Sequence, residues 1–233
     1  MENSGKTRNE DLSDTMRTYL AAIYRLDDHE GEDSIYVSTS ALADVLDVSA
    51  PAVNRMVTKL REAGYLVHEP YQGIHLTESG VREALLQLRR HRLVEAFLVN
   101  VMGFGWHEVH EEASRMSQRL SDVMEQRMAE MAGNPTTCPH GEPIPDANGH
   151  LPPIDDMLLS DAPLKTPLVL SRVRTRERDR LEYLEALGLV PGTTLEVLNV
   201  APFHGPIQLR VGNEYRIIGH NLALMIRVKH DET

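Results

Sequence analysis

Prolines are concentrated in one segment of this 233-residue chain, where eight of the 13 lie between Pro135 and Pro167. Proline lacks a backbone N–H and fixes its own φ, so the stretch GNPTTCPHGEPIPDANGHLPPIDD cannot run as a regular helix or strand. This stretch separates an N-terminal portion, whose pattern is almost wholly helical, from a C-terminal portion with a different pattern. We therefore expect separate small domains joined through it.

The composition is that of an ordinary globular protein, with 41% hydrophobic and 25% charged residues. A net charge of −11 argues against general attraction to nucleic acid, so any DNA contact must come from a local basic surface. The single cysteine, Cys138, excludes an internal disulfide framework. Because we find neither an apolar run long enough to cross a bilayer nor a secretory signal, we expect a cytoplasmic protein with no membrane partner.

A helix-turn-helix pattern lies in SALADVLDVSAPAVNRMVTKLREAGYLV. It predicts a helix over residues 40–46, a tight turn, and a second helix with Ser49 as N-cap and Pro51 in its first turn. One face of the second helix is apolar, while the other presents residues able to reach base edges and phosphates from the major groove. The residues predicted to face DNA are Ser49, Pro51, Ala52, Asn54, Arg55 and Lys59.

The flanking segments complete a winged helix. After Gly64, the alternating runs YLVHEP and GIHLT enclose Tyr71-Gln72-Gly73, which is the pattern of a β-hairpin and, after a recognition helix, of a wing. Upstream, DTMRTYLAAIYRL predicts a helix with one buried face. We predict a winged helix-turn-helix DNA-binding domain over residues 1–76. Its first 11 residues are almost without apolar side chains and should be flexible.

Two longer helices are predicted next, from Thr77 to about Val101 and from about Trp106 to Ala132. Apolar residues, many of them methionines, recur on the second helix at spacings of three and four, as in a helix bundle or a dimer seam. Two helices alone cannot bury both of their faces. We therefore predict that residues 77–150 form a helical dimerisation and metal-binding domain of a homodimer.

Three polar residues interrupt the apolar faces of these helices. His91 and Glu95 are four residues apart on the first helix, and His110 lies on the apolar stripe of the second. Buried imidazole and carboxylate groups need partners, and one divalent cation can serve all three. We predict a metal site at these residues. A metal site beside a DNA-reading domain indicates a metal-responsive regulator.

The order of motifs resembles a known family over nearly the whole chain. A winged helix followed by HRLVEAFL, WHEVHEEASR and NPTTCPHGEPIP is similar to the metal-dependent repressors of the diphtheria toxin repressor and manganese transport regulator (DtxR/MntR) family. The segment from ERDRLEYLEALGLVPG onward resembles the small SH3-like domain, similar to the ferrous iron transport accessory (FeoA) domain, that many members carry. Alternating strands at 194–200 and 207–211, a turn at Gly212-Asn213 and a last strand at 225–228 agree with it.

The resemblance implies a mainly α protein with a small β domain. The N-terminal winged helix-turn-helix and the helical dimerisation domain are then followed by a linker at 151–165 and a C-terminal SH3-like barrel at 166–233.

The resemblance also implies two metal sites. The ancillary site of such repressors matches His91, Glu95 and His110, and the SH3-like domain usually completes it. The corresponding positions are Glu177, which we predict as a fourth ligand, and Arg180, which cannot ligate. The family's bridging site falls on Thr18, Ser114, Ser117 and Gln118. None of these is a good ligand for a divalent cation, so the bridging site is predicted to be lost or rebuilt from acidic residues such as Asp14, Glu108, Glu111 or Glu112.

The donor set narrows the choice of cofactor. Imidazoles with carboxylate and no thiolate suit Mn(II) or Fe(II) better than Cu(I), and we favour Mn(II) with Fe(II) as the alternative. Cys138 and His140 in CPHG are also ligand types. The neighbouring prolines favour an ordered turn packed near the dimer over a second metal site, and the role of these two residues stays open.

The function predicted is a metal-dependent transcriptional repressor of metal homeostasis that binds a double-stranded DNA operator and is not an enzyme. Three alternatives keep a similar fold: a regulator whose metal site is purely structural, one that senses a non-metal ligand, and a dimerisation module that does not bind DNA. A metal hydrolase is disfavoured because the three candidate ligands lie in apolar stripes without a nearby nucleophile or phosphate-binding glycine loop.

Overall fold

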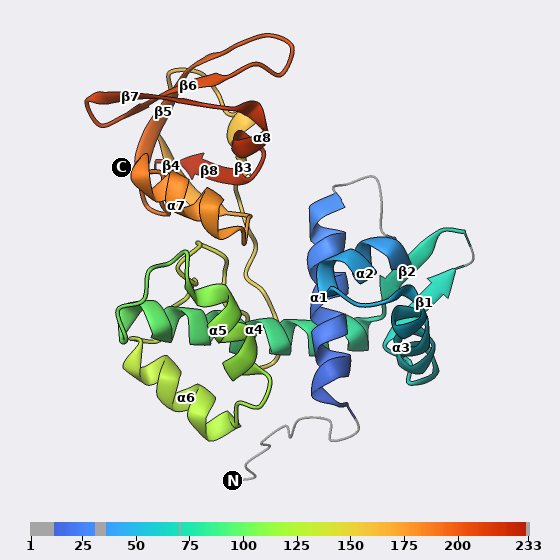
Figure 1. Cartoon of the computed structure of the whole chain (residues 1–233). Coiled ribbons are helices and arrows are strands. Elements are labelled where there is room, and N and C mark those ends of the chain that lie inside the picture. Colours follow the sequence, from blue (N-terminus) through green and yellow to red (C-terminus); the bar gives the residue numbers. More distant parts are fainter. Residues whose placement is uncertain (1–11, 31–35, 70, 232–233) are drawn as a thin grey trace. The chain divides into compact units, whose positions relative to one another are not determined.

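The computed structural model describes residues 12–30, 36–69 and 71–231, which form two compact units (Figure 1). The first unit holds the chain up to Arg90 together with the short segments 117–120 and 145–151, and the second holds the remainder. The flexibility expected of residues 1–11 falls outside the described residues. No helix in the described ranges has both the length and the apolar character that crossing a membrane requires.

The first unit contains the winged helix. Its elements are α1 (Asp14–Glu30), α2 (Thr39–Leu46), α3 (Ala50–Glu62), β1 (Leu66–Glu69) and β2 (Gly73–Leu76). The side chain of Ser38 caps α2 by accepting from the backbone N–H of Ala41, and Asp47 ends α2 in the left-handed region with φ 51°. A capped start and a left-handed stop produce the short turn that a helix-turn-helix requires.

The wing is an antiparallel pair in which Leu66 lies opposite Leu76. The hairpin is anchored to the domain by a bridge between Val37 and Ile74, both fully buried. Gly73 has φ 135°, and a Cβ there would lie 2.7 Å from the carbonyl oxygen of Val37, so only glycine permits this close approach. One apolar cluster, drawn from the three helices and both strands, holds the wing on the helices.

The middle helices differ from the sequence prediction at one point. Helix α4 (Glu78–Asn100) begins after Thr77, whose hydroxyl accepts from the N–H of Gly80. The single helix predicted from Trp106 to Ala132 is instead two helices, α5 (Val109–Ser117) and α6 (Asp122–Met131). The physical reason is local: the Ser121 side chain accepts from the N–H of Met124 and caps a new helix at this point.

The C-terminal part of the second unit is a small β domain. Its elements are β3 (Met157–Leu158), a 3₁₀ turn (Leu159–Asp161), β4 (Leu168–Val173), α7 (Arg178–Ala186), β5 (Thr194–Val200), β6 (Ile207–Val211), β7 (Glu214–Ile218), α8 (His220–Ala223) and β8 (Ile226–His230). The six strands are antiparallel in the order β3-β8-β4-β5-β6-β7. Segment 151–165, predicted as a linker, contributes β3 and the 3₁₀ turn to this domain.

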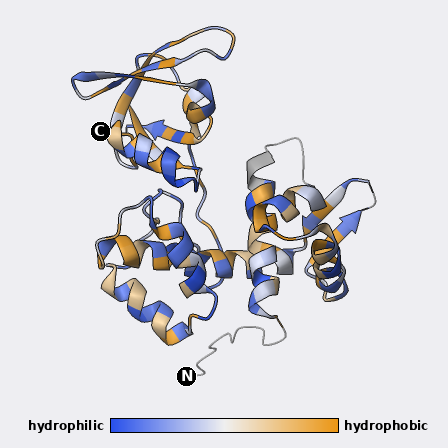
Figure 2. Cartoon of the chain, viewed as in Figure 1, coloured by the Kyte–Doolittle hydropathy of each residue, from blue (hydrophilic) through white to orange (hydrophobic). Residues whose placement is uncertain are grey.

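The core of the β domain includes a residue from the helical part of the same unit. Trp106 is buried in one cluster with Leu168, Leu181 and Val228, and Val99 of α4 packs against that cluster. Figure 2 shows hydrophobic residues running through the strands of this domain, interspersed with hydrophilic ones. The helical and β parts of the second unit therefore share buried contacts.

Candidate metal centre and DNA-reading helix

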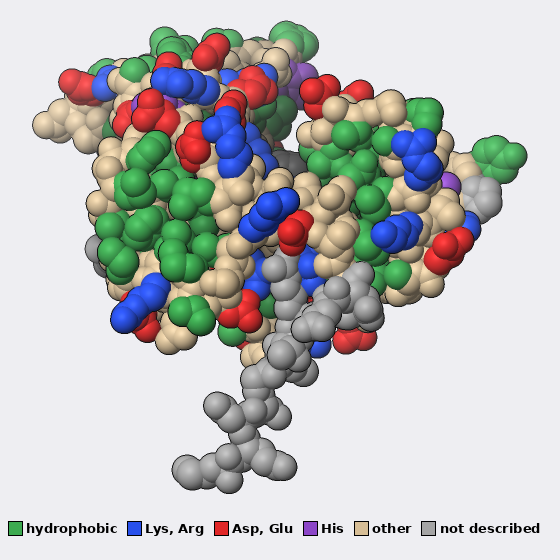
Figure 3. Space-filling view, turned by 60° about the horizontal axis from the view of Figure 1, so that its bottom comes forward, with side chains coloured by type: hydrophobic (Ala, Val, Ile, Leu, Met, Phe, Trp, Pro, Cys, Tyr) green, Lys and Arg blue, Asp and Glu red, His purple; other side chains and the backbone are tan. Residues whose placement is uncertain are grey.

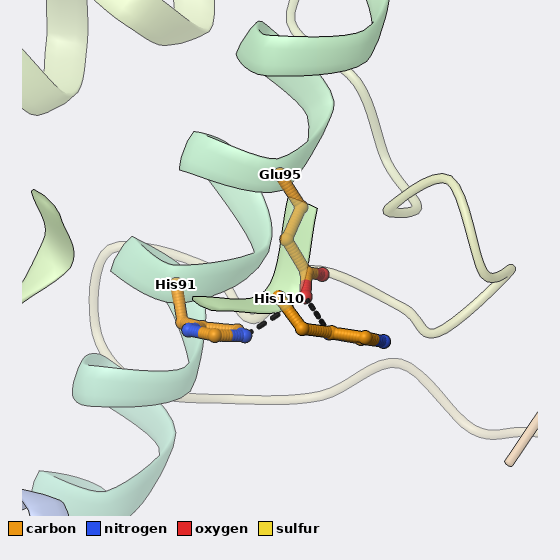
Figure 4. Close-up of side chains that lie close together, drawn as sticks. All are labelled: His91, Glu95 and His110. Carbon is orange, nitrogen blue, oxygen red and sulfur yellow. Dashed lines mark hydrogen bonds and ion pairs between the residues drawn. The ribbon is translucent and has the colours of Figure 1, made fainter. Parts of the chain in front are cut away.

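Two imidazoles meet one carboxylate between α4 and α5. Nε2 of His91 lies 2.8 Å from Oε1 of Glu95, one helical turn away, and Nδ1 of His110 lies 2.7 Å from the same oxygen. Figure 4 shows both rings directed at this carboxylate, with the second nitrogen of His110 pointing away from it. The structure thus brings together the three residues that the sequence singled out on two apolar helix faces.

The carboxylate of Glu95 is charged although it is buried. Burial alone raises its pKa, but the charge of His91 and hydrogen bonds from His110 and His91 hold the pKa well below its usual range. Burial lowers the pKa of His110 and outweighs the opposite effect of Glu95. A buried anion with a neutral imidazole beside it is a donor set ready for a cation.

The second ring nitrogen of His110 also belongs to this cluster. Nε2 of His110 is buried and has no hydrogen-bond partner among the described residues. Such an orphaned nitrogen is costly in a protein interior unless something binds it. The ligand atoms of His91, Glu95 and His110 all lie within 4.8 Å of one another, and two imidazoles with a carboxylate fit a divalent cation.

Two further ligand-type residues adjoin Glu95, and the sequence had left their role open. Nδ1 of His140 lies 3.7 Å from Oε2 of Glu95 and 3.7 Å from Sγ of Cys138. The rings of His110 and His140 stack with their centroids 4.2 Å apart. Glu95, Cys138 and His140 form a second group whose ligand atoms all lie within 4.8 Å of one another. Burial, followed by the nearby charge of Glu95, raises the pKa of the Cys138 thiol well above its usual range.

Glu177 does not lie in either group. Its Oε2 is 2.8 Å from Nε of Arg180, and its side chain is 62% exposed. The neighbouring Arg176 instead faces the cluster, with Nη2 3.4 Å from Nε2 of His91. The sequence pattern did not single out Arg176, because it is one of five arginines in the charge-rich run RVRTRERDR, which resembles a solvated segment.

Two of the four bridging positions of the family carry hydroxyls that bond to their own helices. The Thr18 hydroxyl donates to the carbonyl of Asp14, and the Ser114 hydroxyl donates to that of His110. The acidic residues considered for a rebuilt site have arginine partners instead. Asp14 lies 3.9 Å from Arg17, Glu108 pairs with Arg178, and Glu111 and Glu112 both pair with Arg115. These contacts give no sign of a rebuilt bridging site.

Helix α3 has the surface expected of a DNA-reading helix. Val53, Val57 and Leu60 are buried, which fixes the orientation of the opposite face. Of the residues predicted to face DNA, Ala52 is half-buried and the others are exposed: Ser49, Pro51, Asn54, Arg55 and Lys59. Ser49 occupies the N-cap position without a side-chain capping bond, so its hydroxyl is available to a ligand.

Family models match three consecutive parts of the chain. Residues 11–74 match the N-terminal DNA-binding domain of iron-dependent repressors, residues 77–146 match their metal-binding and dimerisation domain, and residues 157–230 match the FeoA domain. The order of the matches is the order of the domains in the structure.

Individual proteins are similar over almost their full length. The iron-dependent repressor IdeR of Mycobacterium bovis is 31% identical over 94% of this chain and 98% of its own. A solved manganese-dependent transcriptional repressor in complex with manganese has a TM-score of 0.84 and 32% identity, covering 93% of this chain and all of that one. The crystal structure of T. acidophilum IdeR has a TM-score of 0.79 and 28% identity, with 92% and 97% covered.

Winged helix, helical domain and FeoA-type β domain thus occur here in the same order as in these repressors. The chain belongs to the iron-dependent repressor family, the metal-dependent transcriptional repressors of the diphtheria toxin repressor and manganese transport regulator type.

Proposed function

We propose that this repressor binds its operator in response to a divalent cation held by His91, Glu95 and His110, with Mn(II) favoured and Fe(II) as the alternative. The observation that carries the proposal is the shared Oε1 of Glu95, with an imidazole nitrogen 2.8 Å away on one side and 2.7 Å away on the other. If the two imidazoles were exposed to solvent, each would form its own hydrogen bonds with water. Here α4 and α5 hold both against one buried oxygen.

A cation supplies positive charge at the point where the three ligands converge. Each ligand then has a separate role. Glu95 provides the negative charge. His91 is a second ligand from α4, the helix that carries Glu95, and His110 is a ligand from α5. Glu177, which directly follows Arg176, is our proposed fourth ligand, and its carboxylate must leave Arg180 to reach the site. Cation binding would thereby favour one arrangement of α4, α5 and the segment before α7.

We assign DNA binding to the exposed face of α3, and we propose that the protein binds DNA as a homodimer. A dimer reads two half-sites, so the separation of its two recognition helices must match the helical repeat of DNA. A cation that favours the matching arrangement tightens operator binding, and linkage requires operator to tighten cation binding equally.

The surface proposed for dimerisation lies on the helical part of the second unit. Figure 3 shows hydrophobic side chains gathered on one face there. The exposed apolar residues of these helices and of the loop after α4 are Val101, Met102, Val123, Met124 and Met131. Exposed apolar clusters of this kind mark interaction sites in soluble proteins.

The test measures DNA affinity at fixed salt by fluorescence anisotropy. Duplexes are first selected from a random library by the wild-type protein, in parallel with Mn(II) and with chelator. We expect the wild type and a His230→Ala control to bind at least about tenfold more tightly with Mn(II) or anaerobic Fe(II) than with chelator. His91→Ala should lose that difference. Equal affinity of the wild type in both conditions overturns metal control and favours a constitutive repressor with a structural site.

A further inference from the structure

We propose that Cys138 and His140, together with Glu95, form a second cation site that contains a thiolate ligand and shares the Glu95 carboxylate with the first. The two sites use opposite oxygens of that carboxylate. Oε1 faces His91 and His110, while Oε2 faces His140. The proposal stands whether or not the first site controls DNA binding.

The spacing of the ligand atoms fits a small tetrahedral ion. With metal–sulfur bonds of about 2.3 Å and metal–nitrogen bonds of about 2.0 Å, sulfur and nitrogen on one tetrahedral ion lie roughly 3.5 Å apart. Sγ of Cys138 and Nδ1 of His140 are 3.7 Å apart, and Nδ1 is 3.7 Å from Oε2 of Glu95. The first distance is close to that expected for two ligands of one ion, and the second is longer than an ordinary N–H···O hydrogen bond.

The orientation of His140 supports the same conclusion. Its Nε2 lies 2.8 Å from the carbonyl oxygen of Trp106, to which it donates a hydrogen bond. The proton is therefore on Nε2, and Nδ1 presents its lone pair to Cys138 and Glu95 in the neutral ring. Ligating histidines in metal proteins are characteristically held this way, with the second nitrogen donating to a backbone carbonyl.

The turn that carries both residues is fixed by the β domain. The N–H of Val173 in β4 donates to the carbonyl of His140 at 2.9 Å. Gly141 has φ 84°, and a Cβ there would lie 2.0 Å from the carbonyl oxygen of Ser171, so only glycine fits against β4. Side-chain ligands on a rigid turn lose little freedom on binding, as a preorganised site requires.

Salt bridges hold the residues that follow the turn. Arg92 of α4 donates to the carbonyl of Pro143 at 2.6 Å and pairs with Glu142 at 3.0 Å. Arg172 of β4 contacts the same carboxylate at 3.4 Å and pairs with Asp156 at 2.7 Å. The segment after Cys138 is thus fastened to α4, which carries Glu95, and to β4.

The chemical class of the cation follows from the ligands. Thiolate, imidazole and carboxylate together suit Zn(II), Co(II) or Fe(II) better than Mn(II), which prefers oxygen-rich sites. When the ion binds, the S–H bond of Cys138 is replaced by a sulfur–metal bond, and the proton passes to solvent. The site with the thiolate would then prefer Zn(II), Co(II) or Fe(II), while the site of His91, Glu95 and His110 would accept Mn(II).

The test uses Co(II), because thiolate ligation gives a charge-transfer band in the near ultraviolet. Cys138 is the only cysteine of the chain, so such a band has a single possible source. We expect the band in the wild type and in His230→Ala, and its loss in Cys138→Ser. Bound cobalt should fall from about two ions per chain to about one in that variant.

Cobalt K-edge absorption of the wild type provides a check that needs no folded variant, since a sulfur ligand is detected directly. Bound cobalt without a charge-transfer band or sulfur ligand in the wild type overturns the proposal and leaves CPHG as a structural turn. All measurements are made without DNA. A wild type with the band but with metal-independent DNA binding would instead refute the proposed function alone.

Discussion

Nη2 of Arg176 lies 3.4 Å from Nε2 of His91, so a guanidinium stands beside a nitrogen that the proposed Mn(II) or Fe(II) site requires. The residue as a whole is exposed, but its guanidinium is desolvated, and this burial lowers the pKa of Arg176. Because like charges repel strongly in a partly buried site, Arg176 should weaken cation binding.

Replacing this arginine therefore should strengthen metal binding. We expect Arg176→Gln to lower the dissociation constant for Mn(II) by about tenfold, or about 1.4 kcal/mol. Titration calorimetry with Mn(II) measures this dissociation constant in the wild type and in the variant. Arg178→Gln removes the same charge two residues later, where the side chain pairs with Glu108 and Glu182, and should leave the constant unchanged. Weaker binding in Arg176→Gln would show that the guanidinium supports the site.

The fourth ligand can be tested separately. If Glu177 leaves Arg180 and ligates the cation, Glu177→Gln should raise the dissociation constant for Mn(II) by about tenfold. Glu182→Gln, on helix α7 that begins directly after Glu177, is the matched control. Calorimetry at one pH compares the two variants, and an unchanged constant in Glu177→Gln removes this residue from the ligand set.

Substitutions on α3 should separate DNA binding from metal binding. Arg55→Ala removes an exposed guanidinium from the predicted reading face, and we expect it to weaken operator binding by about 1–3 kcal/mol while cobalt binding stays unchanged. Lys229→Ala, also exposed but on β8, controls for the loss of positive charge. If both variants lose the same DNA affinity, the contact is a general charge effect and not a reading contact of α3.

The apolar surface of the helical part should govern assembly. Met124 is 48% and Met131 61% exposed. A charge placed at either position would have to be buried in a dimer interface, so Met131→Glu should shift sedimentation from dimer to monomer and weaken operator binding. Phe203→Glu changes an equally apolar residue, 97% exposed, in the β domain and should remain dimeric. A dimeric Met131→Glu places the interface elsewhere.

Acid stability should depend on Asp146 in the proline-rich segment. Hydrogen bonds from the backbone N–H of His150 and that of Asn148 lower the pKa of Asp146 to about 2 from its ordinary 3.8. A lowered carboxyl pKa stabilises the folded state above pH 3.8, and that contribution is lost as the pH falls towards 2. The melting temperature of Asp146→Asn should lie below that of the wild type at pH 5, and the difference should shrink towards pH 2. The exposed Asp155→Asn should show no such convergence.

Local pattern was enough to predict the winged helix, the long helix α4 and strands β5, β6 and β8 of the β domain. Helix caps and hydrophobic periodicity act over a few residues, so they can be read directly from the sequence. The same reasoning linked His91 to Glu95, because residues four apart share one helix face. It missed the break at Ser121, where a local cap interrupts a helical pattern that continues on both sides.

The sequence by itself determined the family, the domain order and the presence of two histidines and a glutamate on apolar helix faces. Only the tertiary structure decided which further residues join His91 and His110 around Glu95. Cys138 and His140 reach it because β4 and Arg92 hold an irregular, proline-rich segment in place, and Arg176 reaches His91 from 85 residues away in the chain. Contacts between segments without periodicity depend on long-range packing, and that packing forms only once the whole unit has folded.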